Sequence, residues 1–310
     1  MFIKTFLRFF IVLWITIGSI NSAPGSNIPK KLLNVPIALT TGEILTLNDF
    51  KEKQPVYLKF WATWCQPCMQ QMPHFQKIHE KYGKEIQVIA INLAVNDQLK
   101  DVLKVSKKFN LTMPMSLDKS GDLAQNFHLL GTPYHLLFDR QINLVHVTND
   151  SDKALTNKIE LLTKNQPLKH LNEQSFYSSE MKPINFGTST QAILFTATWC
   201  DWYFAQTRAE MATQCINAQN LLNLLAKQRP NLKISGQLSR LWTDDKAMKK
   251  YGQRFNIKHP LFIDKSNQYF HQLAIKNIPT LVLIKNGKVI KKITDFENAN
   301  TILSELSTLQ

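Results

Sequence analysis

A duplicated pattern of residues constrains the fold of this 310-residue chain more than any other feature. Residues 60–65 read Phe-Trp-Ala-Thr-Trp-Cys, and residues 195–200 read Phe-Thr-Ala-Thr-Trp-Cys. A second pair of segments, 110–120 and 256–266, shares Asn, Pro, Asp, Lys and Ser at matching positions. Self-similarity on this scale indicates two copies of one structural unit in tandem.

The spacing of the motifs also divides the chain. A further proline follows the shared proline by 19 residues in both copies, as Pro133 and as Pro279. We therefore expect a first domain near 27–165 and a second near 185–310. The intervening residues, 166–184, are mostly polar and contain prolines, which is typical of a linker.

Within each copy, apolar stretches of strand length alternate with stretches of helical spacing. In the first copy a strand at 56–62 precedes a helix at 66–82, a strand at 86–93 and a helix-like stretch at 97–109. A hairpin at 134–147 and a last helix complete the unit. This alternation predicts an α/β fold with two tandem domains, each a mixed central sheet flanked by helices.

The first 25 residues have the layout of an export signal. Lys4 and Arg8 supply positive charge, residues 9–17 are almost wholly apolar, and small residues follow. The apolar run is shorter than the ~20 residues of a spanning helix, so we expect cleavage, with an uncleaved membrane anchor as the alternative. Either outcome predicts a periplasmic or other extracytoplasmic location.

The formal net charge of the chain is +14. The sequence contains neither a helix-turn-helix pattern nor an aromatic-plus-basic RNA motif, so we do not expect nucleic-acid binding. A basic exported chain is compatible with peripheral association with an anionic membrane or envelope surface.

Two of the four cysteines are three residues apart at the predicted junction between a buried strand and a helix. At a helix start, unpaired N–H groups and the helix dipole favour the thiolate, which is the attacking species in disulfide exchange. Cys65 is therefore the predicted nucleophile and Cys68 the resolving thiol. Pro67 suits the first helical turn, where its missing N–H costs little. A purely structural disulfide is the alternative, but the adjoining Trp64 favours redox function.

Three groups of residues resemble one family. They are Phe-Trp-Ala-Thr-Trp-Cys-Gln-Pro-Cys at 60–68, Met-Pro at 72–73 and Gly-Thr-Pro at 131–133. Together they are similar to the exported TlpA/ResA-like thiol–disulfide oxidoreductases of the thioredoxin superfamily. The resemblance covers nearly all of the first copy and implies a thioredoxin-like domain that needs no cofactor. It also implies that Pro133, preceded by Thr132, is a cis-proline facing the dithiol, in a groove where substrate backbone pairs.

Two residues depart from the family pattern. Many relatives have Glu three residues after the second Cys, where this chain has Gln71, which cannot move a proton. Lys59, six residues before the first Cys, takes the place of a buried acid or polar residue. One hypothesis is that a buried Lys59 ammonium favours a thiolate in the dithiol. The alternative is a lysine that extends to the sheet edge.

The second copy lacks a complete dithiol. Tyr203 stands where the resolving cysteine would be, and the only other thiol is Cys215. A straight helix over 201–215 would separate Cys200 from Cys215 by about 20 Å, whereas a kinked segment would bring them together. A disulfide between them, a reactive lone Cys200 and two inert thiols all stay open. Pro279 keeps the cis-proline position, so this copy is expected to be a degenerate thioredoxin-like domain whose groove can hold a partner.

The leading functional prediction is an exported disulfide reductase. By resemblance, it would take electrons from a membrane donor and reduce disulfide-bearing exported proteins. A disulfide oxidase or isomerase is the second hypothesis, and the reduction potential distinguishes the two. A third is a non-enzymatic module in which the paired thiols hold Cu(I). No second Cys-x-x-Cys or His-x-x-His exists to complete a zinc site, so no structural metal is expected.

Overall fold

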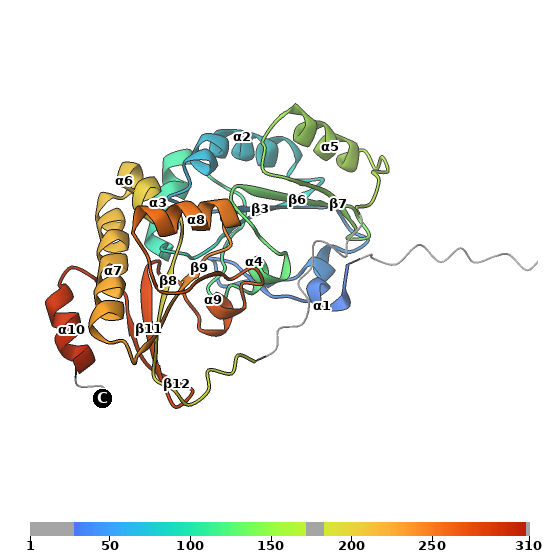
Figure 1. The fold of residues 1–310 in the computed structure, drawn as a ribbon. Coiled ribbons are helices and arrows are strands. Elements are labelled where there is room, and N and C mark those ends of the chain that lie inside the picture. The colour runs from blue at the N-terminus through green and yellow to red at the C-terminus, as the bar shows by residue number, and fades with distance from the viewer. Residues whose placement is uncertain (1–27, 172–182, 308–310) are drawn as a thin grey trace, which may run out of the picture.

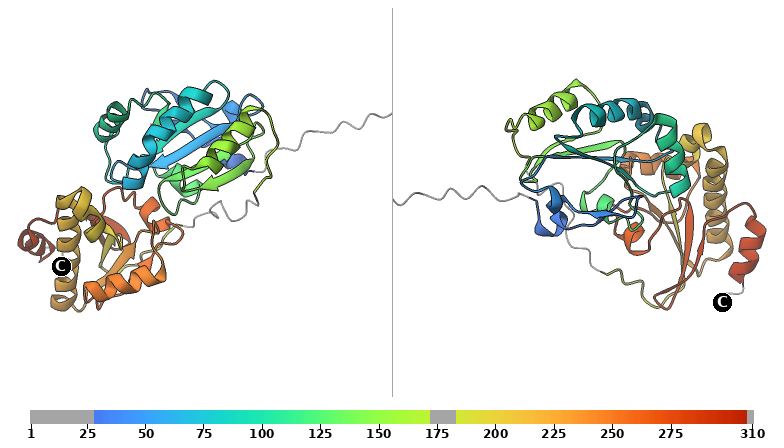
Figure 2. Two further views of the ribbon diagram at one scale, coloured as in Figure 1. Left: turned by 90° about the horizontal axis from the view of Figure 1, so that it is seen from above. Right: turned by 180° about the vertical axis from the view of Figure 1, so that it is seen from behind.

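The computed structural model describes residues 28–171 and 183–307. The predicted leader lies outside the described residues. The described residues form two lobes that lie against each other (Figure 2): a first lobe, 28–171, and a second lobe, 183–307. Each lobe is built around a five-stranded sheet. No helix within the two lobes is long and apolar enough to cross a membrane.

The sheet of the first lobe has the strand order β5-β4-β3-β6-β7. Its strands are β3 (Val56–Trp61), β4 (Gln87–Asn92), β5 (Met115–Leu117), β6 (Tyr134–Phe138) and β7 (Leu144–Thr148). The central strand β3 pairs in parallel with β4 and antiparallel with β6. All six residues of β3 are buried, which explains why this strand is a continuous apolar run interrupted only by Lys59.

The sheet of the second lobe repeats this arrangement as β10-β9-β8-β11-β12. Its strands are β8 (Gln191–Thr196), β9 (Lys233–Leu238), β10 (Leu261–Ile263), β11 (Thr280–Lys285) and β12 (Lys288–Ile293). The parallel and antiparallel pairings match those of the first sheet. Even the irregularity in the last hairpin recurs, between Leu137 and Phe138 and again between Leu283 and Ile284. The predicted α/β fold with mixed sheets is therefore confirmed.

Helices cover the faces of both sheets. In the first lobe these are α2 (Gln66–Tyr82), α3 (Leu99–Phe109), α4 (Asp122–Asn126) and α5 (Lys153–Thr163). In the second lobe they are α6 (Cys200–Thr207), α7 (Ala209–Gln228), α8 (Asp245–Arg254), α9 (Gln268–Gln272) and α10 (Ala299–Ser307). Figure 1 shows α2 and α5 over one face of the first sheet, and α7 alongside the second sheet with α10 outside it. The first lobe begins with α1 (Lys30–Leu33), the β1–β2 pair (Ile37–Ala38 with Ile44–Leu45) and a 3₁₀ turn at Leu47–Phe50.

Between the first strand and the last helix of the two repeated units, four short elements are missing from the predicted order of strands and helices. The edge strands β5 and β10 have three residues each, and the helices α4 and α9 have five. Three residues are too few to show an alternating pattern, and five are little more than one helical turn. These elements are held by tertiary pairing and packing, which periodicity does not detect.

One cluster of buried apolar side chains runs through both lobes. It includes Trp64 and Phe75 of the first lobe together with Phe195, Phe204 and Phe270 of the second. A smaller cluster fills the far side of the second lobe, beneath α7. Because the main core is continuous across the boundary, the two lobes pack through an apolar interface.

Candidate active site

The predicted dithiol lies where β3 ends and α2 begins. Cys65 and Cys68 are joined by a disulfide, with their Cα atoms 5.2 Å apart. Cys65 is the N-cap residue of α2, and its sulfur accepts a hydrogen bond from the backbone N–H of Cys68 at 3.2 Å. Pro67 occupies the first turn. When the disulfide is reduced, this N–H and the helix dipole favour a thiolate on Cys65.

The Gly-Thr-Pro segment lies beside this turn. The peptide bond between Thr132 and Pro133 is cis, and Thr132 and Pro67 line one open groove. The buried hydroxyl of Thr132 has no hydrogen-bond partner among the described residues. The indole N–H of Trp64 donates to the carbonyl of Val95 at 2.7 Å, which fixes the side chain next to Cys65.

Lys59 lies in the middle of β3 with none of its side chain exposed, so the alternative of a lysine at the sheet edge is wrong. Its ammonium donates to Oε1 of Gln71 at 2.7 Å. The same oxygen lies 3.0 Å from Nε2 of His135. The side-chain amide of Gln71 donates to the carbonyl of Asn149, whose own amide donates to the carbonyl of Pro133. A hydrogen-bonded chain therefore links Lys59 to the cis-proline segment.

Burial sets the charge states of the side chains in this hydrogen-bonded series. Desolvation lowers the pKa of Lys59 to about 7, since Gln71 offers no opposing charge. Desolvation and then the Lys59 charge lower the pKa of His135 well below its ordinary value, so the imidazole is neutral. Tyr57, whose pKa burial raises, donates its hydroxyl proton to Nδ1 of His135 at 2.6 Å. This assigns the remaining proton to Nε2, which donates to Gln71.

The shift at Lys59 predicts a pH dependence of stability. Between about pH 7 and 10.5 the unfolded chain binds a proton that the folded chain does not, so the free energy of unfolding should rise with pH across this range. Lys59→Met should flatten that rise, whereas Lys77→Met, at an exposed position on helix α2, should not. Urea unfolding at several pH values measures both. Equal slopes in the two variants would contradict the assignment. Alkylation of the reduced Lys59→Met chain tests the separate hypothesis that Lys59 favours a thiolate.

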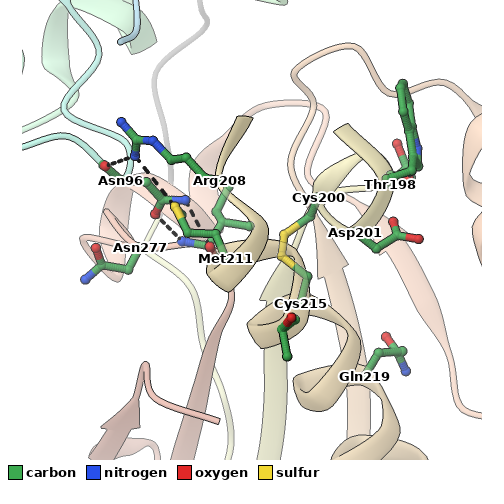
Figure 3. Close-up of a disulfide and its surroundings, with 12 residues drawn as sticks. Asn96, Thr198, Cys200, Asp201, Arg208, Met211, Cys215, Gln219 and Asn277 are labelled. Atoms are coloured by element: carbon green, nitrogen blue, oxygen red, sulfur yellow. Dashed lines mark hydrogen bonds between the residues drawn. A yellow bond between two sulfur atoms is a disulfide. The ribbon is translucent and has the colours of Figure 1, made fainter. Parts of the chain in front are cut away.

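The two cysteines of the second lobe are joined to each other. Cys200 begins α6, Cys215 lies in α7, and their Cα atoms are 6.0 Å apart in a disulfide (Figure 3). The helix is not continuous: α6 ends at Thr207, and Arg208 has non-helical dihedral angles (φ −151°, ψ 72°) before α7 starts. This break folds the segment back on itself and brings together sulfurs that a straight helix would hold far apart.

The second lobe covers the dithiol of the first. Trp64 stacks on Trp199 with ring centroids 5.2 Å apart. The hydroxyl of Tyr203 accepts a hydrogen bond from the backbone N–H of Gln66, the first residue of α2, at 2.9 Å. Cys65 and Cys68 have no exposed surface in this arrangement. Tyr203, three residues after Cys200, thus contacts the helix start that carries Cys65 and Cys68.

The contacts between the lobes are reciprocal. The backbone N–H of Asn96 donates to the carbonyl of Lys276 at 2.8 Å, and that of Trp242 donates to the carbonyl of Leu130 at 2.9 Å. The two donors, Asn96 and Trp242, are 146 positions apart, and so are the two acceptors, Leu130 and Lys276. The same spacing of 146 separates Pro133 from Pro279, so the two bonds join equivalent positions of the two lobes. Each loop therefore approaches the segment before the other lobe's cis-proline.

The segment before the cis-proline of the second lobe is contacted by the first lobe. The peptide bond between Ile278 and Pro279 is cis, as in the first lobe. The side-chain amide of Asn96 pairs with the backbone of Ile278 through two hydrogen bonds, of 2.7 and 2.9 Å. Asn96 thereby imitates a strand of backbone against the residue that precedes the proline.

Arg208 of the second lobe forms an ion pair and hydrogen bonds with the first lobe. Its guanidinium forms an ion pair of 2.9 Å with Asp97, donates to the carbonyl of Asn96 at 2.7 Å and donates to the hydroxyl of Thr63. The Asp97 side chain is fully buried and also accepts from the backbone N–H of Thr63, two residues before Cys65. Sequence reasoning missed Arg208, Asp97 and Asn96, because more than a hundred residues separate Arg208 from its partners.

No group of three or more His, Cys, Asp or Glu side chains within residues 28–171 and 183–307 is placed to hold a metal ion.

Comparison with known proteins identifies the family. Residues 24–147 match the AhpC/TSA family model. The thioredoxin-like protein YneN of Bacillus subtilis is 32% identical over 124 residues, which cover 39% of this chain and 72% of that protein. The thiol-disulfide oxidoreductase ResA of Bacillus thuringiensis is 32% identical over 114 residues, 36% of this chain and 64% of that protein, so the chain spans just under two thirds of it. The crystal structure of StoA from Bacillus subtilis is 25% identical and covers 40% of this chain and 92% of that chain, with a TM-score of 0.35. With its Cys-x-x-Cys pair at the start of α2, the chain belongs to the TlpA/ResA-like thiol–disulfide oxidoreductases of the thioredoxin superfamily.

Proposed function

We propose that this oxidoreductase is a reductase acting on the disulfides of other exported proteins. The observation that carries the proposal is the position of Cys65 as N-cap of α2, bonded to Cys68 one turn along. In the reduced enzyme, the Cys65 thiolate attacks a substrate disulfide and releases one substrate thiolate. Cys68 then attacks the mixed disulfide and releases the second. Two electrons pass to the substrate, and the Cys65–Cys68 disulfide that remains is reduced again by a donor dithiol.

The leader-like residues 1–25 support an extracytoplasmic location for this cycle. The second lobe is, in this proposal, a degenerate thioredoxin-like domain. Its Cys200 is paired with Cys215 across a helix break and has no cysteine at the resolving position, so it takes no part in the two-thiol cycle. Its contribution is the surface that it places against the first lobe.

Trapping tests the proposed substrates. In a Cys68→Ser chain the mixed disulfide on Cys65 cannot be resolved, so exported proteins with disulfides should accumulate on it and be identifiable by mass spectrometry after non-reducing separation. The matched control is Cys65→Ser, which keeps Cys68 but lacks the nucleophile. Equal recovery of partners on both variants would contradict the assigned order of attack.

The reduction potential of the Cys65–Cys68 couple tests the direction. Equilibration with glutathione or dithiothreitol buffers, followed by alkylation and mass determination, gives the value. A reductase requires a potential close to that of thioredoxin, about −270 mV, whereas an oxidase such as DsbA lies near about −120 mV. A value near the second figure would overturn the reductase proposal and favour a disulfide oxidase.

A further inference from the structure

An open groove of about 720 Å³ runs along the boundary between the lobes, beside the dithiol turn. Its first-lobe side is formed by Pro67, between the two active cysteines, and by Thr132, immediately before the cis-proline. The other described residues that line it all belong to the second lobe. A segment bound here would lie next to Cys65 while contacting mainly a lobe that has no Cys-x-x-Cys pair of its own.

The side of the groove nearest the dithiol contains a polar group without a hydrogen-bond partner among the described residues. The hydroxyl of Thr132 is buried and has no hydrogen-bond partner among the described residues. A buried hydroxyl without a partner costs free energy, and a bound peptide backbone is a natural source of one. This places the first expected contact with a ligand immediately beside the cis-proline.

Aromatic side chains of the second lobe form the wall of the groove. Trp202 is 55% exposed and Trp242 is 42% exposed, although tryptophan is usually largely covered in a folded protein. Tyr203 and Trp199 continue the wall toward Cys65, against Trp64. Gly131 makes room for Trp242, since a Cβ there would lie only 2.6 Å from the indole nitrogen. Exposed aromatic clusters of this kind are typical of recognition surfaces.

A basic stripe borders the aromatic wall. Lys246, Lys250 and Arg254 line the groove from α8 at intervals of four residues, so they share one helix face. Arg254 is paired with Asp201 at 2.8 Å, whereas Lys246 and Lys250 are exposed and form no ion pair with an acid in the part of the chain that the structure describes. Among the described residues that line the groove, Asp244 is the one acid, and its carboxylate caps the start of α8. The groove is therefore net positive, and like charges on one helix face repel until an anion lies against them.

We propose that this groove binds an acidic, extended segment of the exported partner protein, next to the disulfide that Cys65 attacks. The proposal rests on the proposed function and assigns substrate selection to the second lobe. Apolar side chains of the segment pack on Trp202 and Trp242, and its carboxylates face Lys246 and Lys250. Tyr203 still covers Cys65 in the docked arrangement, so the bound segment waits beside the dithiol until this cover moves.

Peptide binding to the oxidised full chain tests the proposal without any redox step. Two fluorescent peptides of equal length, with serine in place of cysteine, differ only in Glu or Lys around an aromatic residue. The Glu peptide should bind more tightly, by about tenfold at low salt, and the preference should shrink as salt screens the charges. Lys246→Glu with Lys250→Glu should reverse the preference.

Lys249→Glu with Lys258→Glu is the matched control, because these exposed lysines change the net charge equally but do not line the groove. If both double variants lose the preference for the Glu peptide equally, the preference depends only on the overall charge of the protein, and the proposal is wrong. A second result would also overturn the proposal: the wild type shows no preference between the peptides but binds vesicles of phosphatidylglycerol and phosphatidylcholine, and Lys246→Glu/Lys250→Glu abolishes that vesicle binding. Reduction of a small disulfide by the Lys246→Glu/Lys250→Glu chain should persist in every case, which separates failure of this site from failure of the proposed function.

Discussion

Replacing Arg208 by methionine is expected to raise the alkylation rate of the reduced Cys65 thiol by at least about tenfold. The measurement uses a Cys68→Ser background, so that Cys65 is the only thiol of the first lobe, and a small neutral reagent such as iodoacetamide. Cys65 has no exposed surface when the lobes are docked, so the reagent reacts only through an opened form. The rate then follows the fraction of molecules that is open.

The expected size follows from the contacts that Arg208 makes. Hydrogen bonds to charged groups contribute about 1.5–3 kcal/mol, and about 1.4 kcal/mol corresponds to a factor of ten in an equilibrium. Arg208→Met removes an ion pair with the fully buried Asp97 and further bonds to Asn96 and Thr63. Every one of these crosses from one lobe to the other.

Arg254→Met is the control for this result. Arg254 also forms an ion pair, at 2.8 Å, but with Asp201, and it donates to the carbonyl of Thr198, both within the second lobe. It should leave the alkylation rate nearly unchanged. Tyr203→Phe, which removes only the bond to the Gln66 N–H, should have an intermediate effect. If Arg208→Met and Arg254→Met react equally, with native near-ultraviolet circular dichroism in both, the lobes do not control access to Cys65.

Removal of the second disulfide is expected to destabilise the second lobe by about 3 kcal/mol, the chain-entropy value for a closed loop of about 15 residues. The variant is Cys200→Ala with Cys215→Ala, whose native partners lie 15 positions apart. Urea unfolding of the oxidised proteins, followed by circular dichroism, measures the loss. Alanine avoids placing a hydroxyl in two buried positions.

The dithiol supplies the comparison. Cys65→Ala with Cys68→Ala opens a loop between residues only three positions apart, so the same reasoning gives roughly half the loss. Equal destabilisation by the two double variants would contradict a cross-linking role for the second disulfide. Arg208 lies at the break between α6 and α7, which the Cys200–Cys215 disulfide spans. Removal of that disulfide should therefore also speed alkylation of Cys65.

The duplication made much of the fold predictable. Strands that pair across the sheet centre are long apolar runs, and the predicted helix 66–82 coincides with α2 because Pro67 and Gly83 mark its ends. The edge strands β5 and β10 were not predicted, because three residues are too few to show an alternating apolar pattern. The dithiol was readable because its chemistry depends on local spacing at a helix start.

The relation between the lobes was not readable. Tyr203 was interpreted only as the loss of a resolving thiol, yet its hydroxyl meets the backbone of Gln66 in the other lobe. Lys59 was recognised as unusual, but His135, which bonds to the same Gln71 oxygen, was concealed in the apolar pattern of β6. Contacts of this kind depend on packing between distant segments, and neither propensity nor periodicity encodes them.

The reciprocal bonds of Asn96 with Lys276 and of Trp242 with Leu130 have the form of an isologous contact, in which two identical subunits exchange the same interaction. In a homodimer every substitution at such a surface is imposed on both sides at once. Joining the halves in one chain removes that constraint and keeps the partner at a high local concentration. The two halves of this chain can accordingly differ at matching positions: one carries a pair of sulfurs at its helix start, and the other places the aromatic side chain of Tyr203 against that helix start.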